Sequence, residues 1–438
     1  MKALILAGGK GTRLSPLTGD AIPKPMAMMD GKPVLLRAVE SLKRYGITDF
    51  IFTVGHLHEK ITDFFGDGSR FGVKIFYLVE SSPLGSGGAL FYAKDFTDDT
   101  LLVCSGDTVF NIDVQRMTEF HRRNHAEITL LVHPNGHPFD SDLIVTDGDR
   151  VTDIDFKGNE RNYFYENKVN AGFFLFEKTA LDFFTEPKKI NIEHDFLYHM
   201  IKNGRPVYAY SSTEYIKDVG TPDRFTAVEN EVRAGIPTAR SLSSPQKCVF
   251  LDRDGVLNDY RGFIRTPDEL TVIPGVGTAI KRLNQAGFLT VLVTNQPVVA
   301  RGECTYEGLR EIHRKLETEL GKEGGYLDAI YFCPHHPDSG FEGEVKELKI
   351  DCDCRKPKTG MIDAACERFH IDRARSFMIG DADTDILCGK NAGVTTVLVP
   401  SDRPAKGNPP ADYNANDLSD AIEWIFEREK EYNTKGGK

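Results

Sequence analysis

Short apolar runs alternate with amphipathic stretches along most of the chain. In the first half, apolar runs rich in β-branched and aromatic residues cover positions 2–8, 49–55, 73–80 and 101–107. Stretches with apolar residues at helical spacing lie between or after them, at 31–46, 86–96 and 114–124. Because strands that alternate with helices form βαβ units, this pattern predicts a mostly parallel sheet. The texture then changes, and residues 142–156 and 167–177 resemble a hairpin and a further strand.

The alternation restarts in the second half of the chain. Apolar runs cover 248–254, 289–296, 329–333, 376–381 and 395–399, and residues 305–320 show helical spacing. The stretch "AGIPTARSLSSPQK" before them is rich in small and turn-forming residues and has no clear period. The pattern therefore predicts an α/β protein with two Rossmann-like parallel-sheet domains, at residues 1–235 and 247–438, and a linker at 236–246.

Composition narrows the functional classes. A length of 438 residues suggests two or three domains, and a net charge of −11 without a dominant basic stripe argues against nucleic acid as a partner. Neither a signal peptide nor an apolar run of membrane-spanning length is found, so we expect a cytoplasmic protein without a membrane partner. In that compartment the eight cysteines should be reduced, and clustered cysteines indicate metal binding. The expected partners are small molecules, and the sequence leaves the oligomeric state open.

The first strand ends in a glycine-rich basic loop, "LAGGKGTRL". Glycines let backbone N–H groups approach a phosphate, and Arg13 and Lys24 add positive charge. Four further motifs follow: "ESSPLGSGGAL", "SGD" ending at Asp107, "NAGFF" beginning at Asn170, and "KDVGTP" containing Asp218. Any one of these motifs is equally compatible with an ordinary turn, a helix cap or a solvated strand end, so the inference depends on the whole set.

In this order, the five motifs resemble the sugar-1-phosphate nucleotidyltransferase family. The resemblance implies that a nucleoside triphosphate lies over the first loop, including Gly8 and Gly9, with its base near Gly85 and Gly88. Arg13 and Lys24 would hold the phosphates, and Asp107 and Asp218 would bind Mg²⁺. The sugar phosphate would contact Glu80, Lys157 and Asn170, although at Lys157 this chain has "DFKG" where the family usually has Glu-Lys-Pro. Both reactants are anions, so such a site must neutralise charge and align the reactants.

A second strand, near residue 250, ends in two carboxylates, Asp252 and Asp254, followed by glycine. A strand-end aspartate can accept a phosphoryl group if a cation offsets its repulsion from the substrate. With "VTNQ", "CRKPK" and "IGDADTD" downstream, the motif resembles the haloacid dehalogenase-like phosphatases. The resemblance implies that Asp252 is the nucleophile and Asp254 the acid and base. Thr294 and Asn295 would hydrogen-bond the phosphoryl oxygens, and Arg355 would bind substrate phosphate. Asp381 would bind Mg²⁺ together with Asp252 and Asp254, and Asp385 would support this site.

Two features of this half leave alternatives open. Lys356 and Lys358 are both available as the catalytic cation; the resemblance implies Lys356, and the residues alone do not separate them. The loop before them carries the pairs Cys333/His335 and Cys352/Cys354, four ligands that match a closed structural Zn²⁺ site. His336 is a rival to His335. The other cysteines, Cys104, Cys248, Cys304, Cys366 and Cys388, are expected to be buried or incidental thiols.

The zinc loop and the "CRKP" motif narrow the second resemblance to the heptose 1,7-bisphosphate 7-phosphatases and, more distantly, the histidinol-phosphate phosphatases. The resemblance thus implies a bifunctional chain in which the phosphatase makes heptose 1-phosphate and the transferase converts it, with GTP, to GDP-heptose and pyrophosphate. Residue chemistry alone selects neither heptose nor guanine. The alternatives are mannose or glucose 1-phosphate, histidinol phosphate for the phosphatase, or one half that serves as a non-catalytic regulatory module.

Overall fold

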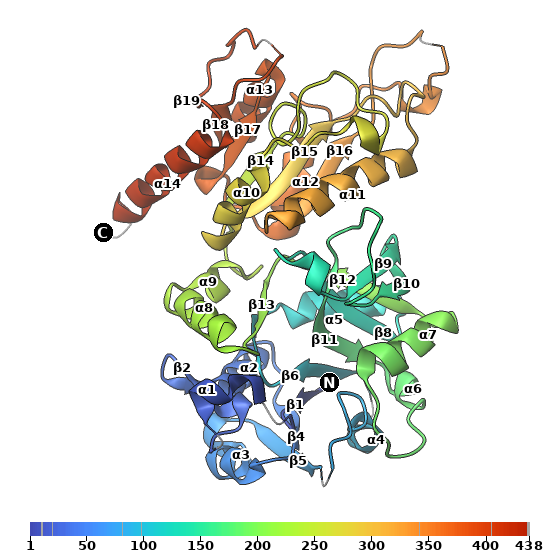
Figure 1. Cartoon of the computed structure of the whole chain (residues 1–438), viewed down its shortest axis with the longest axis vertical. Coiled ribbons are helices and arrows are strands. Elements are labelled where there is room, and N and C mark those ends of the chain that lie inside the picture. The colour runs from blue at the N-terminus through green and yellow to red at the C-terminus, as the bar shows by residue number, and fades with distance from the viewer. Residues whose placement is uncertain are drawn as a thin grey trace. The chain divides into compact units, whose positions relative to one another are not determined.

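The computed structural model describes residues 1–9, 12–19, 21–80, 82–97, 99–340, 342–403 and 405–435. The chain forms two compact units, and Figure 1 shows the order of their elements. The first unit comprises residues 1–133, 142–156 and 169–241, and the second comprises 134–141, 157–168 and 242–438. Among the described residues, no helix has the length and apolar character that crossing a membrane requires.

The first unit is built on a nine-stranded sheet of order β5-β4-β1-β6-β11-β8-β12-β10-β9. Strands β1, β4, β5 and β6 are parallel, as predicted, whereas β11 runs antiparallel to β6 and to β8. The strands are β1 (Lys2–Leu6), β4 (Asp49–Val54), β5 (Lys74–Val79), β6 (Leu101–Ser105), β8 (Ile128–His133), β9 (Leu143–Asp147), β10 (Arg150–Asp155), β11 (Val169–Phe176) and β12 (Val207–Ser211). The predicted hairpin at 142–156 is confirmed as β9 and β10.

Short ribbons and helices complete the first unit. The ribbons are β2 (Met28–Met29) with β3 (Lys32–Pro33), and β7 (Thr108–Asn111) with β13 (Tyr215–Asp218). The helices are α1 (Ser15–Thr18), α2 (Val34–Arg44), α3 (His58–Phe65), α4 (Leu90–Ala93), α5 (Val114–Arg123), α6 (Lys178–Leu181), α7 (Tyr198–Lys202), α8 (Pro222–Arg233) and α9 (Ile236–Ala239). The helices predicted at 31–46 and 114–124 are confirmed. The one predicted at 86–96 is wrong in extent, because its glycines pack against a neighbouring segment and only α4 is α-helical.

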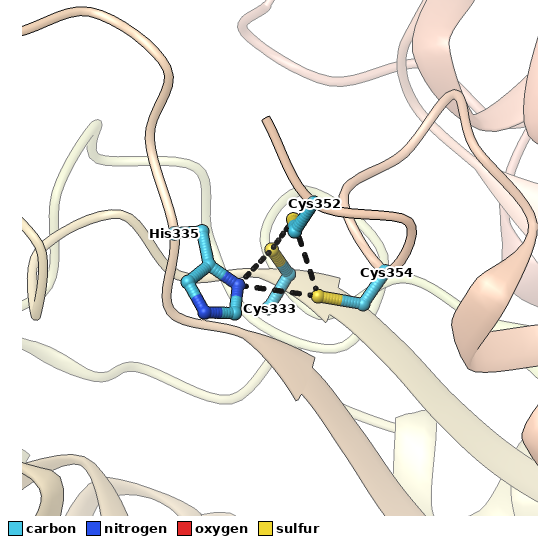
Figure 2. A group of neighbouring side chains, drawn as sticks. All are labelled: Cys333, His335, Cys352 and Cys354. Atoms are coloured by element: carbon cyan, nitrogen blue, oxygen red, sulfur yellow. Dashed lines mark hydrogen bonds between the residues drawn. The ribbon is translucent and has the colours of Figure 1, made fainter. Parts of the chain in front are cut away.

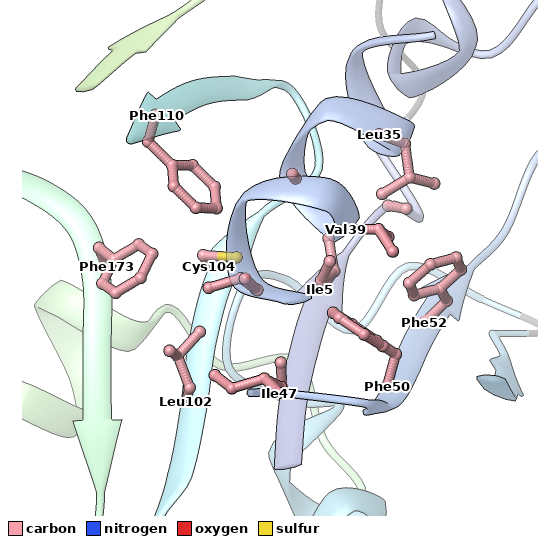
Figure 3. Close-up of a cluster of buried hydrophobic side chains, with 14 of the residues drawn as sticks. Ile5, Leu35, Val39, Ile47, Phe50, Phe52, Leu102, Cys104, Phe110 and Phe173 are labelled. Carbon is pink, nitrogen blue, oxygen red and sulfur yellow. The ribbon is translucent and has the colours of Figure 1, made fainter. Parts of the chain in front are cut away.

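The core of the first unit follows the alternation of side chains along its strands. Ile5, Phe50 and Phe52 point to the face covered by α2, where they meet Leu35 and Val39 (Figure 3). Leu4 and Ile51, one position away on the same strands, belong to the cluster on the opposite face. Successive side chains of a strand point to opposite faces, so continuous apolar runs are needed when both faces are covered. This explains why the runs lack the alternation of a half-exposed sheet.

The second unit contains a parallel sheet of order β16-β15-β14-β17-β18-β19. Its strands are β14 (Cys248–Leu251), β15 (Leu289–Asn295), β16 (Ala329–Cys333), β17 (Phe377–Gly380), β18 (Thr395–Leu398) and β19 (Tyr413–Asn414). Helices α10 (Val276–Gln285), α11 (Tyr306–Lys322) and α14 (Leu418–Lys435) pack on one face, and α12 (Gly360–Phe369) and α13 (Asp383–Ala392) on the other. This doubly covered parallel sheet confirms the predicted fold class.

Two segments of the N-terminal half, 134–141 and 157–168, belong to the second unit. The backbone N–H of Tyr165 donates to Thr318 Oγ1 at 3.1 Å, and Glu166 lies within 3.7 Å of Arg310 and 3.5 Å of Arg314 on α11. No sequence pattern indicated this packing. The predicted linker is also ordered: it includes α9, and Arg240 donates through Nε and Nη2 to the carbonyl oxygen of Thr213. The chain passes from the first unit to the second between residues 241 and 242.

Candidate active sites

Strand ends bring the acidic and basic residues of the first unit together. Asp218 lies beside Thr108 in the β7–β13 ribbon, and the N–H of Val219 donates to the carbonyl oxygen of Asp107 at 3.0 Å. This pairing brings Asp107 and Asp218 together, although 110 positions separate them in the sequence. Two carboxylates so placed supply the oxygen ligands that Mg²⁺ prefers.

The two predicted cations lie at the same place. Lys24 Nζ forms a close ion pair with Asp107 Oδ2. A side chain at Gly220 would begin 2.7 Å from Asp218 Oδ1, 3.4 Å from Lys24 Nζ and 3.6 Å from Arg13 Nη2. The structure therefore gathers Arg13, Lys24, Asp107 and Asp218 around Gly220. Arg224, which the sequence reasoning missed, also binds Asp218, with Nη1 at 3.0 and 2.8 Å from its two oxygens.

The glycine-rich loops differ in what their glycines do. A side chain at Gly8 would begin 3.0 Å from Glu80 Oε2, so this loop lies directly against that carboxyl group. Burial raises the pKa of Glu80. Among the described residues, apart from the chain neighbours of Gly9, no atom comes within 4 Å of the equivalent point at Gly9. Lys10 and Gly11 of the same motif lie outside the described residues.

In the second loop, glycine is required by the protein's own packing. A Cβ atom at Gly85 would lie 2.4 Å from the carbonyl oxygen of Ile190, and one at Gly88 would lie 2.5 Å from that of Lys188. These contacts fix the loop against residues 188–190 and account for both glycines without a ligand. The predicted contact between this loop and a base remains a prediction.

The predicted sugar-phosphate residues divide between the two units. Asn170 lies at a bulge of β11, where its Oδ1 accepts from the N–H of Gly172 at 3.2 Å and its Nδ2 reaches Glu193 Oε1 at 3.5 Å. Glu193 was missed from the sequence; burial raises its pKa, and no motif distinguished it. Lys157 is part of the second unit, where its Nζ pairs with Asp140 Oδ1 at 2.7 Å.

In the second unit, four buried polar groups meet at the carboxyl ends of β14 and β17. Asp252 follows β14, Asp381 follows β17, and Asp385 lies in the first turn of α13. Lys356 joins them with its Nζ 2.8 Å from Asp252 Oδ1 and 2.7 Å from Asp385 Oδ1. All four residues are at most 6% exposed. The carboxyl ends of neighbouring parallel strands converge, which is why such sites form at this edge of a sheet.

Burial changes the proton affinities of these groups. It raises the pKa of Asp252 to about 7, against the opposing effect of Lys356 and with a further rise from the Asp385 charge. It also raises the pKa of Asp381 to about 6. The two facing carboxylates raise the pKa of Lys356 although burial opposes them. A lysine that stays charged between two carboxylates is suited to offset the charge of a bound phosphate.

The oxygens of this site fit a divalent cation. Asp252, Asp381 and Asp385 each offer a carboxylate oxygen within 4.8 Å of the others. Asp381 Oδ2 accepts from Ser401 Oγ at 2.6 Å, whereas its buried Oδ1 has no partner among the described residues. A buried carboxylate oxygen without a hydrogen-bond donor is suited to bind a metal ion. Glycine at position 255 lets the loop after β14 lie against Asp381, because a side chain there would begin 2.3 Å from Asp381 Oδ2.

Among the described residues, the side chain of Asp254 is not part of this carboxylate group, and its role as a magnesium ligand remains a prediction. Its carboxylate is surrounded by Arg253, Asn258 and Gln296. These donors hold the carboxylate in one orientation. Asp385, which the sequence predicted only to support the site, supplies the third carboxylate of the group.

Thr294 and Asn295 end β15, the strand beside β14. Thr294 is buried, and its Oγ1 accepts from Gln296 Nε2 at 3.0 Å. The amide of Asn295 binds the backbone of Lys356 twice, as donor at 3.1 Å and as acceptor at 3.0 Å. Asn295 thus positions the lysine, and the phosphoryl contact expected of it remains a prediction. Lys358 instead pairs with Asp351, and Arg355 Nη1 donates to the carbonyl oxygen of His335 at 3.2 Å.

Three sulfurs and one nitrogen cluster beside this site (Figure 2). The Sγ atoms of Cys333 and Cys352 are 3.5 Å apart, and those of Cys352 and Cys354 are 3.3 Å apart. His335 Nδ1 lies 3.3 Å from Cys354 Sγ and 3.7 Å from Cys333 Sγ. A Zn²⁺ ion with Zn–S bonds of about 2.3 Å would have its ligand atoms at the corners of a tetrahedron with edges of about 3.8 Å. The cluster is close to that size, so its residues fit Zn²⁺.

His335, and not its neighbour, belongs to the cluster. His336 Nδ1 accepts from the N–H of Asp338 at 3.1 Å. All eight cysteines are free, and Cys104, Cys248 and Cys388 are buried. The cluster lies directly before Lys356 in the chain, and the N–H of Gln296 donates to the carbonyl oxygen of Cys333 at 2.7 Å. A metal there would therefore anchor both the lysine segment and the end of β15.

Comparison with known proteins assigns a family to each half of the chain. The family described as "Nucleotidyl transferase" matches residues 2–235, and the one described as HAD-hydrolase-like matches residues 353–421. A D-glycero-beta-D-manno-heptose-1,7-bisphosphate 7-phosphatase of Haemophilus ducreyi is 41% identical over 184 residues, which are 41% of this chain and 98% of that protein. The chain belongs to both the nucleotidyl transferases and the heptose-bisphosphate 7-phosphatases.

Relatives of each half extend the comparison. A mannose-1-phosphate guanylyltransferase of Mycobacterium tuberculosis is 32% identical over 243 residues, which are 55% of this chain and 67% of that protein. A solved structure of a D,D-heptose 1,7-bisphosphate phosphatase from B. bronchiseptica, complexed with magnesium and phosphate, is 35% identical, with a TM-score of 0.37. It covers 42% of this chain and 99% of that one. The predicted union of a nucleotidyltransferase with a haloacid dehalogenase-like phosphatase in one chain is confirmed.

Proposed function

We propose that the chain catalyses two successive reactions of GDP-heptose synthesis. The second unit removes the 7-phosphate of heptose 1,7-bisphosphate, and the first transfers a guanylyl group from GTP to heptose 1-phosphate and releases pyrophosphate. The observation that carries the proposal is the presence of both families in one chain, because the phosphatase would make the substrate of the transferase. The names of the phosphatase relatives support heptose as the sugar of the substrate. The name of the mycobacterial relative supports GTP as the nucleotide substrate. GTP and sugar phosphates are cytoplasmic metabolites, so the cytoplasm stays the predicted compartment.

In the phosphatase reaction, Asp252 attacks the phosphorus and forms an aspartyl-phosphate as the bond to the sugar oxygen breaks. Asp254 donates a proton to that oxygen and later takes one from the water that hydrolyses the intermediate. Lys356 offsets the negative charge of the phosphoryl group, and Thr294 donates a hydrogen bond to it. Asp252, Asp381 and Asp385 would hold Mg²⁺, which would add charge neutralisation. Arg355 and the Cys/His cluster orient the substrate and hold the lysine segment.

In the transferase reaction, the 1-phosphate oxygen of the sugar attacks the α-phosphorus of GTP, and the bond to pyrophosphate breaks. Arg13 and Lys24 hold the triphosphate over Gly8 and Gly9. Asp107 and Asp218 would hold Mg²⁺, which would help to neutralise the charge of the two anionic reactants. Glu80 and Asn170 contact the sugar phosphate in this proposal, and Glu193 joins them through Asn170. The carboxylates of Asp107 and Asp218 would then exchange their pairing with Lys24 and Arg224 for the metal.

The test supplies wild-type protein with heptose 1,7-bisphosphate, GTP and Mg²⁺ and identifies the product by mass spectrometry. We expect GDP-heptose from the wild type. The Asp252→Asn variant should make none from the bisphosphate, yet should make it from heptose 1-phosphate. Mannose 1-phosphate is assayed in parallel, because the name of the mycobacterial relative makes mannose the second candidate sugar. The other nucleoside triphosphates are assayed in the same way. A nucleotide sugar that still carries the 7-phosphate, formed efficiently by the variant, would overturn the order of the steps.

A further inference from the structure

Arg253 separates the two catalytic aspartates in the sequence, and its side chain is completely buried. Arginine is almost never fully buried unless it is paired, because taking the charge out of water costs several kcal/mol or more. The question is what a buried guanidinium contributes beside two catalytic carboxylates.

Its partner is Asp254. Arg253 donates to Asp254 Oδ1 from Nε at 3.1 Å and from Nη2 at 3.0 Å, and to Oδ2 from Nη2 at 3.1 Å. Gln296 closes the arrangement: its Oε1 accepts from Arg253 Nη2 at 2.9 Å, and its Nε2 donates to Asp254 Oδ2 at 2.9 Å. Asn258 Nδ2 adds a hydrogen bond to Oδ1 at 3.0 Å. Every rotation of the Asp254 carboxyl group would break several of these contacts.

Stability alone does not account for this arrangement. Arg253 Nη1 is buried and has no partner in the part of the chain that the structure describes. A buried ion pair that leaves a donor unsatisfied is often less stable than an apolar replacement of similar size. Arg253 also balances the charge of Asp254, so that Asp252, Asp381 and Asp385, with Lys356, carry a net charge of −2 that suits one divalent cation. The geometry is therefore that of a support for one catalytic group.

We propose that Arg253 and Gln296 are positioning residues that hold the Asp254 carboxyl group in line for proton transfer. The inference rests on the proposed function, in which Asp254 protonates the sugar oxygen as its bond to phosphorus breaks. A carboxyl group that turns away cannot deliver this proton, and a sugar alkoxide leaves very slowly without it. A nitrophenolate leaves without a proton. The loss of activity caused by replacing a positioning residue should therefore be large for a sugar alkoxide leaving group and small for a nitrophenolate.

The experiment measures kcat/KM of full-length protein on heptose 1,7-bisphosphate and on p-nitrophenyl phosphate. The first variant is Arg253→Lys, which keeps the positive charge but loses the paired Nε and Nη2 donors. The second is Gln296→Leu, which at similar size removes the hydrogen bonds to Arg253, Asp254 and Thr294. We expect each to lose about 100-fold on the sugar substrate, the lower end of general-acid contributions, and less than about 5-fold on the nitrophenyl ester. Asp254→Asn should show the same selectivity. Arg282→Met, which removes an exposed ion pair with Glu423, is the matched control.

A similar loss on both substrates, in variants that keep wild-type zinc content and melting temperature, would overturn the inference. If Arg253→Lys does not fold, the Gln296→Leu result decides alone. A different result would refute the proposed function instead: an Asp252→Asn variant that hydrolyses p-nitrophenyl phosphate at the wild-type rate, or an Asp254→Asn variant without leaving-group selectivity. The two failures are thus distinguishable within one set of measurements.

Discussion

Lys356 places its ammonium Nζ 2.8 Å from Oδ1 of Asp252, the carboxylate that begins the proposed phosphatase reaction. Its near neighbour Lys358 forms an exposed ion pair with Asp351 at 2.6 Å. The two lysines are two positions apart in the sequence, yet only one is buried among the carboxylates. The Asn295 amide fixes this choice, since it binds the backbone of Lys356 as both donor and acceptor.

The first prediction compares these two lysines. Lys356→Met should lower phosphate release by at least about 100-fold, because the phosphoryl group would then face Asp252 and Asp385 without a compensating cation. Lys358→Met should stay within about 2-fold of wild type, since exposed ion pairs contribute little. Equal losses in the two variants would contradict the assignment of Lys356 as the catalytic cation.

The second prediction concerns the Cys/His cluster. Elemental analysis of protein purified without chelator should find about one Zn²⁺ per chain, as a closed four-ligand site implies. Cys352→Ser should lose the metal and most phosphatase activity, because the cluster anchors the segment that carries Lys356. Nucleotidyl transfer should survive. Cys304→Ser, outside the cluster, is the control and should keep both the metal and both activities.

The third prediction concerns the transferase site. Asp107→Asn and Asp218→Asn should each slow pyrophosphate release by about 100-fold or more and raise the Mg²⁺ concentration needed for half-maximal rate. Phosphatase activity should not change, because its residues belong to the other unit. Asp147→Asn, at the exposed end of β9, serves as a control. An unchanged Mg²⁺ requirement in both variants would remove these carboxylates from the metal site.

The fourth prediction is a pH dependence of stability. Burial raises the pKa of Asp252 from 3.8 to about 7, so the folded state binds this proton more tightly than the unfolded state. The resulting stabilisation is complete below about pH 4 and is lost as pH rises toward 7. In magnesium-free buffer, the melting temperature should therefore fall further between pH 5 and pH 7.5 for the wild-type protein than for the Asp252→Asn variant. Added Mg²⁺ should reduce the difference, and identical pH profiles of the two proteins would contradict this account.

The fifth prediction tests the docking of residues 157–168 on α11. Thr318→Val leaves the buried N–H of Tyr165 without its acceptor, which costs about 1–3 kcal/mol. Amide hydrogen exchange across 157–168 should become faster, while Thr318→Ser, which keeps the hydroxyl group, should resemble wild type. Equal exchange rates in the two variants would show that the segment is held by its ion pairs and apolar contacts alone.

The sequence by itself determined the two α/β folds and most of the chemistry. Asp252, Thr294 and Asp381 were predictable because each follows an apolar run, and the carboxyl ends of parallel strands converge on one edge of a sheet. The Cys/His cluster was predictable because Cys333, His335, Cys352 and Cys354 form two close pairs in the sequence. Asp107 and Asp218 were predictable only through family resemblance, since nothing in the sequence alone shows that β7 pairs with β13.

Only the tertiary structure decided which of several neighbouring groups acts. Lys356 and Lys358, or His335 and His336, have the same chemistry, and the direction of each side chain depends on contacts from elsewhere in the chain. The same reason explains the surroundings of Asp254: Arg253 and Gln296 fix its carboxylate through hydrogen bonds that no spacing rule predicts. The packing of residues 157–168 on α11 joins segments about 150 positions apart, and neither period nor composition records such a contact.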